Sequence, residues 1–197
     1  MLRRISQTLQ AASSPWTAAL ASAVFLSFLV FFLPRQAARS PAGTENLPAP
    51  DTSLLYSGED LYRLAGDYGE EGRKEYIQDR FTFDLIFPLA YGFFLTLWIG
   101  LALKRIHPRL AGWRLLNLFP PAGMAFDYLE NISTSAVMAA YPDRIPIFQA
   151  AAPAFTLTKW IFVSGSFVVL IGVLIWWGIS SSRKQPDDQP SRPSTGD

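Results

Sequence analysis

Two carboxylates and an amide occur within one long apolar stretch of this chain. Asp127, Glu130, Asn131 and Thr134 are spaced at i, i+3, i+4 and i+7, so in a helix they share one face. Charged side chains at bilayer depth are costly, and they usually face the protein interior or a water-filled cavity. Two carboxylates held together can serve as an acid/base pair or bind a cationic group. The stripe is therefore a candidate functional site.

The same stripe has a structural interpretation. Polar side chains hydrogen-bond across transmembrane helices, and each such bond contributes roughly 0.6–2 kcal/mol. Two carboxylates within one helical turn fit this interpretation less well, because they repel each other and burial disfavours the ionised form of both. We expect at least one of them to hold a proton unless Lys159 or Arg80 neutralises it. The sequence leaves both interpretations open.

Five further residues are candidates for binding a ligand beside the stripe. Asp84 could belong to the binding site, or it could stabilise the first turn of its own helix, where a negative charge is favoured. Lys159 suits either a carboxylate partner or a snorkelling position near a helix end. Arg73, Tyr76 and Arg80 either anchor the preceding segment against the carboxylates or lipid phosphate, or belong to a solvated charged face.

These residues must be positioned by membrane-spanning helices. Four apolar stretches are long enough to span a bilayer: 16–33, 81–103, 115–140 and 154–179. The first could instead be a cleaved signal peptide, because Arg3 and Arg4 precede it. Its apolar part is longer than a usual signal peptide core and no small-x-small cleavage site follows, so we favour a retained helix.

Prolines modify two of the predicted spans. Pro88 cannot donate to the carbonyl of Asp84, so the entry to the second span should be bent and locally polar. Pro120 and Pro121 predict a kink or a late helix start in the third span.

The remaining segments complete an all-α fold: a four-helix transmembrane bundle with a helical extracytoplasmic loop between helices 1 and 2. Ser57 and Asp60 have capping-box spacing, and Gly66–Gly69 breaks the helix that follows. The predicted segments are a cytoplasmic N-terminus (1–15), a linker (34–53), an extracytoplasmic helical cap (54–80), a cytoplasmic loop (104–114), an outer loop (141–153) and a disordered cytoplasmic tail (180–197).

The distribution of charge predicts the topology. With the N-terminus inside, the inner segments hold 9 basic residues against 3 acidic ones, and the short loop 104–114 holds four of the basic residues. By the positive-inside rule both termini are cytoplasmic, and the chain is a multi-pass protein of the cell inner (plasma) membrane. The polar candidates then lie in the outer half of the bilayer, in a cavity that residues 54–79 would cover.

Composition excludes several classes of function. Half of the 197 residues are hydrophobic, which is typical of a membrane protein. The chain has no cysteine and one histidine, His107 in a predicted loop, so we expect no metal site and no cofactor. No basic stripe suggests nucleic acid, and no nucleotide loop, GxSxG or HExxH motif occurs.

Several short motifs follow one another along the chain: Gly-Glu-Glu-Gly-Arg73 with Tyr76, Asp84 with Pro88, Asp127-Tyr-Leu-Glu-Asn131, and Tyr141-Pro142. In this order and spacing they resemble a family of uncharacterised bacterial four-span integral membrane proteins, over about residues 54–175. The resemblance implies a four-span fold with one large outer loop. It implies no activity.

Three classes of function fit the sequence. We rank first a protein that binds a small amphiphile or lipid in the outer-half cavity, where the carboxylates bind its polar or cationic head. The second is a membrane-embedded enzyme that uses Asp127 and Glu130 as an acid/base pair on a lipid-like substrate. The third is an accessory subunit whose stripe joins a partner membrane protein or a second copy. A transporter is less favoured, because no internal repeat is evident.

Overall fold

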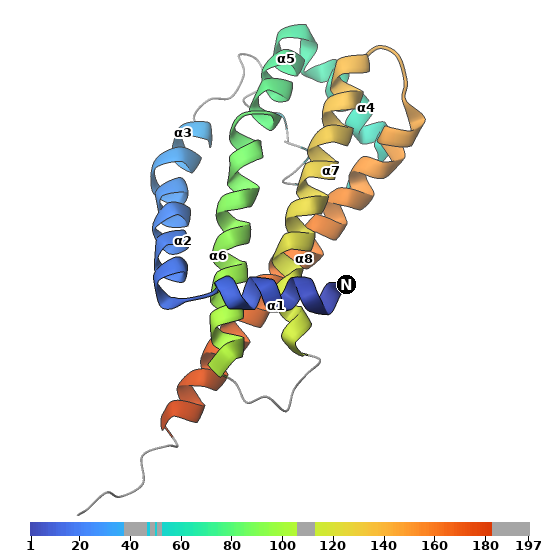
Figure 1. Cartoon of the computed structure of the whole chain (residues 1–197). Helices are drawn as coiled ribbons and strands as arrows, with labels where there is room; N and C mark the ends of the chain where they lie inside the picture. The colour runs from blue at the N-terminus through green and yellow to red at the C-terminus, as the bar shows by residue number, and fades with distance from the viewer. Residues whose placement is uncertain (38–46, 48–49, 51–52, 106–112, 183–197) are drawn as a thin grey trace, which may run out of the picture.

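The computed structural model describes residues 1–37, 47, 50, 53–105 and 113–182. The regular elements in these ranges are all helices (Figure 1), which confirms the all-α prediction. The predicted linker 34–53, the loop 104–114 and the tail 180–197 lie largely outside the described residues, and His107 does so entirely.

Three long helices form the centre of the molecule: α6 (Phe83–Arg105), α7 (Phe119–Ala140) and α8 (Pro146–Ser182). Helix α7 packs against both of the others and most extensively against α8. A 3-10 turn, η3 (Trp113–Leu118), precedes α7, and prolines occupy the first turn of α7. The late helix start predicted from Pro120 and Pro121 is therefore confirmed, since the first turn needs no N–H donor from proline.

Helix α8 begins earlier than the sequence suggested. It starts at Pro146 and includes Pro153, so most of the segment 141–153 is helical rather than a loop. A proline is well tolerated at the first helical position, because its missing N–H has no helical partner there and its φ already suits a helix. The turn between α7 and α8 is correspondingly short.

The first apolar stretch forms a helix that packs against α6. Helix α2 (Pro15–Ser27) continues through a π-helical turn, η1 (Phe28–Phe32), into α3 (Leu33–Ala37). Ser14 and Thr17 form a reciprocal capping box at its start. Phe25 stacks on Phe94 of α6, with ring centroids 4.7 Å apart. The indole N–H of Trp98 donates to the Ser22 hydroxyl at 2.8 Å, so α2 is also held by a polar contact.

Two short helices, α4 (Gly58–Asp67) and α5 (Gly69–Arg80), form a cap at one end of the long helices (Figure 1). The predicted capping box of Ser57 and Asp60 is present. Gly69 adopts φ 65°, a conformation that favours glycine, and turns the chain between the two helices. The cap is anchored by a core of buried residues from both sides: Leu61, Ala65, Tyr76, Val137, Met138 and Ala152.

An N-terminal helix, α1 (Leu2–Ala12), lies across the other end of the long helices (Figure 1). It contacts α6 and η3. The sequence interpretation treated residues 1–15 only as a polar terminus and did not predict this helix.

Three helical stretches are long and apolar enough to cross a membrane: Pro15–Arg35, Gly69–Arg105 and Pro146–Ile179. Helix α7 is not among them. It carries Asp127 and Glu130, which place two charges in the middle of its 22 residues.

Candidate functional site

The two carboxylates of the α7 stripe meet a lysine from α8. Lys159 forms an ion pair with Glu130, and its Nζ lies 3.8 Å from Oδ1 of Asp127. Asp127 and Glu130 share one face of α7, as their spacing predicted, and α8 brings Lys159 to that face. The side chain of Glu130 is 1% exposed and that of Asp127 is 13% exposed. We refer to Asp127, Glu130 and Lys159 as the triad.

Two hydroxyl groups also contact the carboxylates of the triad. Thr156, one turn before Lys159 on α8, donates to Oε1 of Glu130 at 2.7 Å. Tyr91 of α6 donates to Oδ2 of Asp127 at 2.8 Å. Each carboxylate therefore has one hydroxyl donor in addition to the shared ammonium. The sequence interpretation missed both residues, because lone hydroxyl side chains in apolar helices carry no recognisable motif.

A further hydroxyl connects the triad to the cap. The hydroxyl of Tyr56, just before α4, lies 2.9 Å from the hydroxyl of Thr156. Contacts thus run without interruption from Tyr56 through Thr156 and Glu130 to Lys159. The position of the cap is coupled to the site through this connection.

A second charged pair lies at the start of α6. Arg80 forms an ion pair with Asp84, and the Arg80 guanidinium lies over the ring of Tyr76, 4.5 Å from its centroid. Asp84 is in the first turn of α6, where the helix dipole stabilises a negative charge. Its charge is therefore stabilised both by the helix start and by Arg80. The side-chain amide of Asn131 donates to the main-chain carbonyl of Asp84 at 3.4 Å, which joins this pair to the α7 stripe.

Most of the predicted site residues come together, and Arg73 is the exception. Its guanidinium donates to the carbonyl of Ala65 at 3.0 Å and lies over the ring of Tyr141, 4.8 Å from the centroid. Arg73 thus fastens the cap to the turn after α7. The hydroxyl of Thr134 donates to the main-chain carbonyl of Glu130 within α7. Lys159 is buried and paired rather than snorkelling to the surface.

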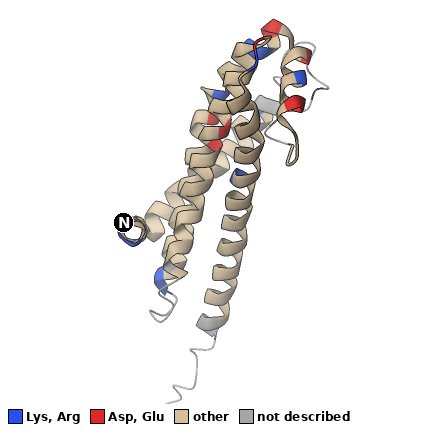
Figure 2. Ribbon diagram, turned by 90° about the vertical axis from the view of Figure 1, so that its right-hand side faces the viewer, with Lys and Arg blue, Asp and Glu red and all other residues tan. Residues whose placement is uncertain are grey.

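The charges are distributed unevenly along the molecule. Figure 2 shows the acidic residues of the described ranges in the half of the molecule that holds the cap, and none near the N-terminal end of α1. At the cap, Arg144 pairs with Glu59, and its hydrogen bond holds the pKa of Glu59 below its usual range. Arg80, Glu130 and Lys159 are buried and Asp84 and Asp127 are partly buried, whereas the Arg144–Glu59 pair of the cap is exposed to solvent.

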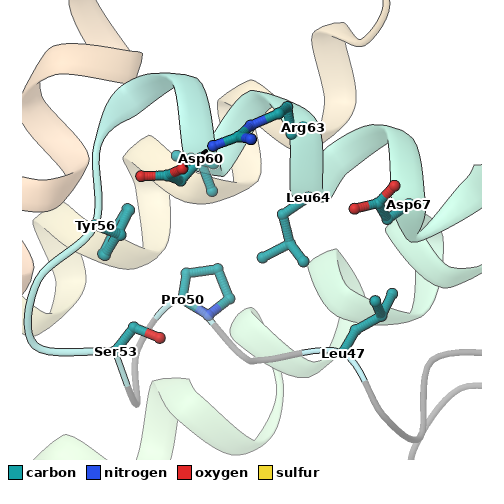
Figure 3. A pocket seen from close by; sticks show the side chains of 9 residues that line it. Leu47, Pro50, Ser53, Tyr56, Asp60, Arg63, Leu64 and Asp67 are labelled. Carbon is teal, nitrogen blue, oxygen red and sulfur yellow. Dashed lines mark hydrogen bonds and ion pairs between the residues drawn. The ribbon is translucent and has the colours of Figure 1, made fainter.

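A cavity of about 260 Å³ lies in the cap (Figure 3). Its walls include Tyr56, Asp60, Arg63, Leu64 and Asp67. Arg63 and Asp60 pair at one edge, and Leu64 points into the space. The triad carboxylates do not line this cavity, and Tyr56 is the residue that connects the two regions.

Within the described ranges, no group of three His, Cys, Asp or Glu side chains could hold a metal ion. No family model, curated protein or solved structure matches the chain.

Proposed function

We propose that the chain spans the membrane four times, through α2 with α3, α6, α7 and α8. Helix α7 has 22 residues, about 33 Å at 1.5 Å per residue, which matches a hydrocarbon core of about 30 Å. Its polar residues lower its mean hydropathy, and its two charged side chains have partners on α6 and α8. Charged residues of spanning helices face the bundle interior in this way.

The cap lies on the outer side and α1 on the inner side. Arg3 and Arg4 belong to α1, and Lys104 and Arg105 form the last turn of α6, where Lys104 bonds to the end of α1; the positive-inside rule puts this end in the cytoplasm. The triad then lies in the outer half of the bilayer, below the cap. This arrangement is that of a multi-pass protein of the inner (plasma) membrane.

The protein binds the cationic head of a small amphiphile at the triad. The observation that carries this proposal is that two carboxylates enclose one ammonium, so the triad has an excess of one negative charge when all three groups are ionised. An excess carboxylate in a low-dielectric environment is stabilised strongly by a cation. A cationic head supplies that charge, and an apolar tail suits the surrounding bilayer.

Asp127 is the residue that contacts the ligand. Glu130 is closed off by Lys159 and Thr156 and retains 1% of its side-chain exposure. Asp127 is farther from the ammonium, at 3.8 Å, and its side chain is 13% exposed. Asp84 at the start of α6 is paired with Arg80 and therefore adds no net charge to the site. Glu130 and Lys159 position Asp127 and preserve the packing of α7 on α8.

The test is native mass spectrometry of the purified protein with two probes of equal chain length, cationic dodecyltrimethylammonium and neutral dodecyl maltoside. Asp127→Asn should weaken binding of the cationic probe about tenfold, equivalent to about 1.4 kcal/mol, and leave the neutral probe unchanged. Lipidomics of the same preparations should show an endogenous amphiphile in wild type that is lost in the variant.

Asp67→Asn is the matched control, because Asp67 lines the cap cavity and not the triad. It should retain the cationic probe and the endogenous amphiphile. Loss of binding in Asp67→Asn but not in Asp127→Asn would move the site to the cap cavity. Equal binding of both probes to all three proteins, together with a large loss of thermal stability in Asp127→Asn, would make the triad a structural network.

A further inference from the structure

Helix α1 is attached to the rest of the molecule through polar contacts. The Ser6 hydroxyl donates to Oδ1 of Asn117 at 2.8 Å, and the Asn117 amide returns a hydrogen bond to the carbonyl of Ser6 at 3.0 Å. The ammonium of Lys104 donates to the carbonyls of Ser13 and Ala11, at 2.6 and 3.3 Å. Ser6 and Ser13 are buried. Helix α1 therefore has a fixed position on the ends of α6 and η3.

The apolar residues of α1 point elsewhere. Leu2 and Ile5 lie on one face and are 62% and 40% exposed, and Leu9 on the same face is only partly covered. An amphipathic helix that docks on a protein normally buries its apolar face. Here the serine edge is buried and the apolar face is left outside, so the apolar face has another partner.

The orientation of α1 identifies where that partner lies. Helix α1 runs across the long helices rather than along them (Figure 1). Trp16 follows it directly and is 85% exposed, and Trp113 contacts Trp176 at the same end of the bundle, with ring centroids 6.0 Å apart. Tryptophan side chains gather where a membrane meets water. Helix α1 thus lies at the level of a membrane surface and parallel to it.

The charge of α1 selects the type of lipid. Arg3 and Arg4 lie away from the apolar face and are exposed. No acidic residue occurs in the chain before Glu45, so nothing on α1 or α2 opposes these charges. Arginine side chains near a bilayer surface are attracted to anionic headgroups.

We propose that α1 is an interfacial helix that binds the inner leaflet of the membrane. Its Leu2, Ile5 and Leu9 face enters the headgroup–acyl boundary, while Arg3 and Arg4 contact anionic headgroups. The proposal rests on the spanning arrangement of the helices and is independent of ligand binding at the triad.

Site-directed spin labelling tests this surface, because the chain contains no cysteine and each label is unique. Ile5→Cys and Gln7→Cys are a matched pair: both positions are exposed, and they lie on opposite sides of α1. The full-length protein is labelled in nanodiscs of phosphatidylcholine alone or with phosphatidylglycerol, and its accessibility to oxygen and to a water-soluble nickel complex is measured.

The label at Ile5 should be accessible to oxygen and protected from nickel, and the label at Gln7 should show the reverse. Phosphatidylglycerol should increase this contrast, and Arg3→Gln/Arg4→Gln should remove the increase. Equal exposure of both labels to nickel would overturn the proposal. Protection of Ile5 from both reagents would indicate a protein partner instead of lipid, and a contrast that phosphatidylglycerol leaves unchanged would overturn the role of the arginines.

Discussion

The side-chain amide of Asn131 donates to the main-chain carbonyl of Asp84, 3.4 Å away in the neighbouring helix. The residue four positions after Asp84 is Pro88, which has no N–H to donate to this carbonyl. Helix α7 thus supplies from outside the hydrogen bond that the proline removes from α6. Asn131 has a structural role that is separate from the charges beside it.

The interaction between Asn131 and Pro88 can be measured by a double-mutant cycle. Asn131→Ala should lower the free energy of unfolding by about 1–3 kcal/mol, because a buried carbonyl loses its donor. In a Pro88→Ala background the new N–H can satisfy the Asp84 carbonyl, so the same substitution should cost less. Thermal unfolding in detergent, followed by tryptophan fluorescence, gives the four stabilities.

Ser133→Ala is the control for this cycle. Ser133 is buried on the same helix, but its hydroxyl bonds to the Leu129 carbonyl within α7. Its substitution should cost the same with and without Pro88. If Asn131→Ala also costs the same in both backgrounds, the Asp84 carbonyl is not the group that Asn131 satisfies.

The pairing of Glu130 with Lys159 predicts a large effect of breaking one side alone. Lys159→Met should destabilise the protein by about 3–5 kcal/mol, because Glu130 is left buried without its cation. Glu130→Gln in the same chain should restore most of that loss, since no uncompensated charge remains. Unfolding temperatures of the two single variants and the double variant provide the measurement. A fully stable Lys159→Met would show that this ion pair does not hold α7 against α8.

The connection through Thr156 predicts a change in the cap. Thr156→Val conserves shape but removes the hydroxyl between Tyr56 and Glu130, so hydrogen exchange in residues 58–67 should accelerate. The expected loss of stability is about 1–3 kcal/mol. Thr158→Val is the matched control, because that exposed hydroxyl bonds only to the Ala154 carbonyl among the contacts described. Equal exchange in the two variants would contradict the coupling.

The Glu59–Arg144 pair predicts a dependence of stability on pH. The hydrogen bond from Arg144 lowers the pKa of Glu59 below its ordinary 4.5. The pair therefore stabilises the fold fully above that value, and the contribution disappears as pH falls through the lower pKa of the folded state. The difference in melting temperature between wild type and Glu59→Gln should be constant near neutrality and shrink toward about pH 3. A difference that does not change over this range would exclude the pair as its source.

The close approach of α1 to α6 predicts the effect of a single methyl group. A Cβ at Gly100 would overlap the Ser13 hydroxyl, so Gly100→Ala should displace α1 and accelerate hydrogen exchange in residues 2–12. Gly172→Ala is the control, because a Cβ there meets nothing within 4 Å. Unchanged exchange in α1 for both variants would mean that the contact at Gly100 does not hold the helix.

The sequence predicted those features that depend on local spacing. The capping box at Ser57, the late start of α7 and the common face of Asp127 and Glu130 follow from positions within one or two helical turns. The polar entry to α6 followed in the same way from Pro88. In each case the physical cause lies within the segment itself.

Features that depend on helix packing could not be predicted. Tyr91 and Thr156 reach the carboxylates from α6 and α8, and Tyr56 reaches Thr156 from the segment before α4, so their contacts depend on how these elements pack. Helix α1 was missed for a different reason. Its leucine and isoleucine spacing is helical, but its short length and many polar residues gave it the composition of a flexible terminus.

Helix α8 extends for 37 residues, about 55 Å, and its internal proline lies near its outer end. Lys159 and Trp176 therefore belong to a single rod that is longer than the bilayer is thick. Lys159 contacts Glu130 of α7 near one end of this helix, and Trp176 contacts Trp113 of η3 near the other. In the spanning arrangement proposed above, one continuous helix therefore joins the triad to the aromatic contact at the opposite end of the bundle.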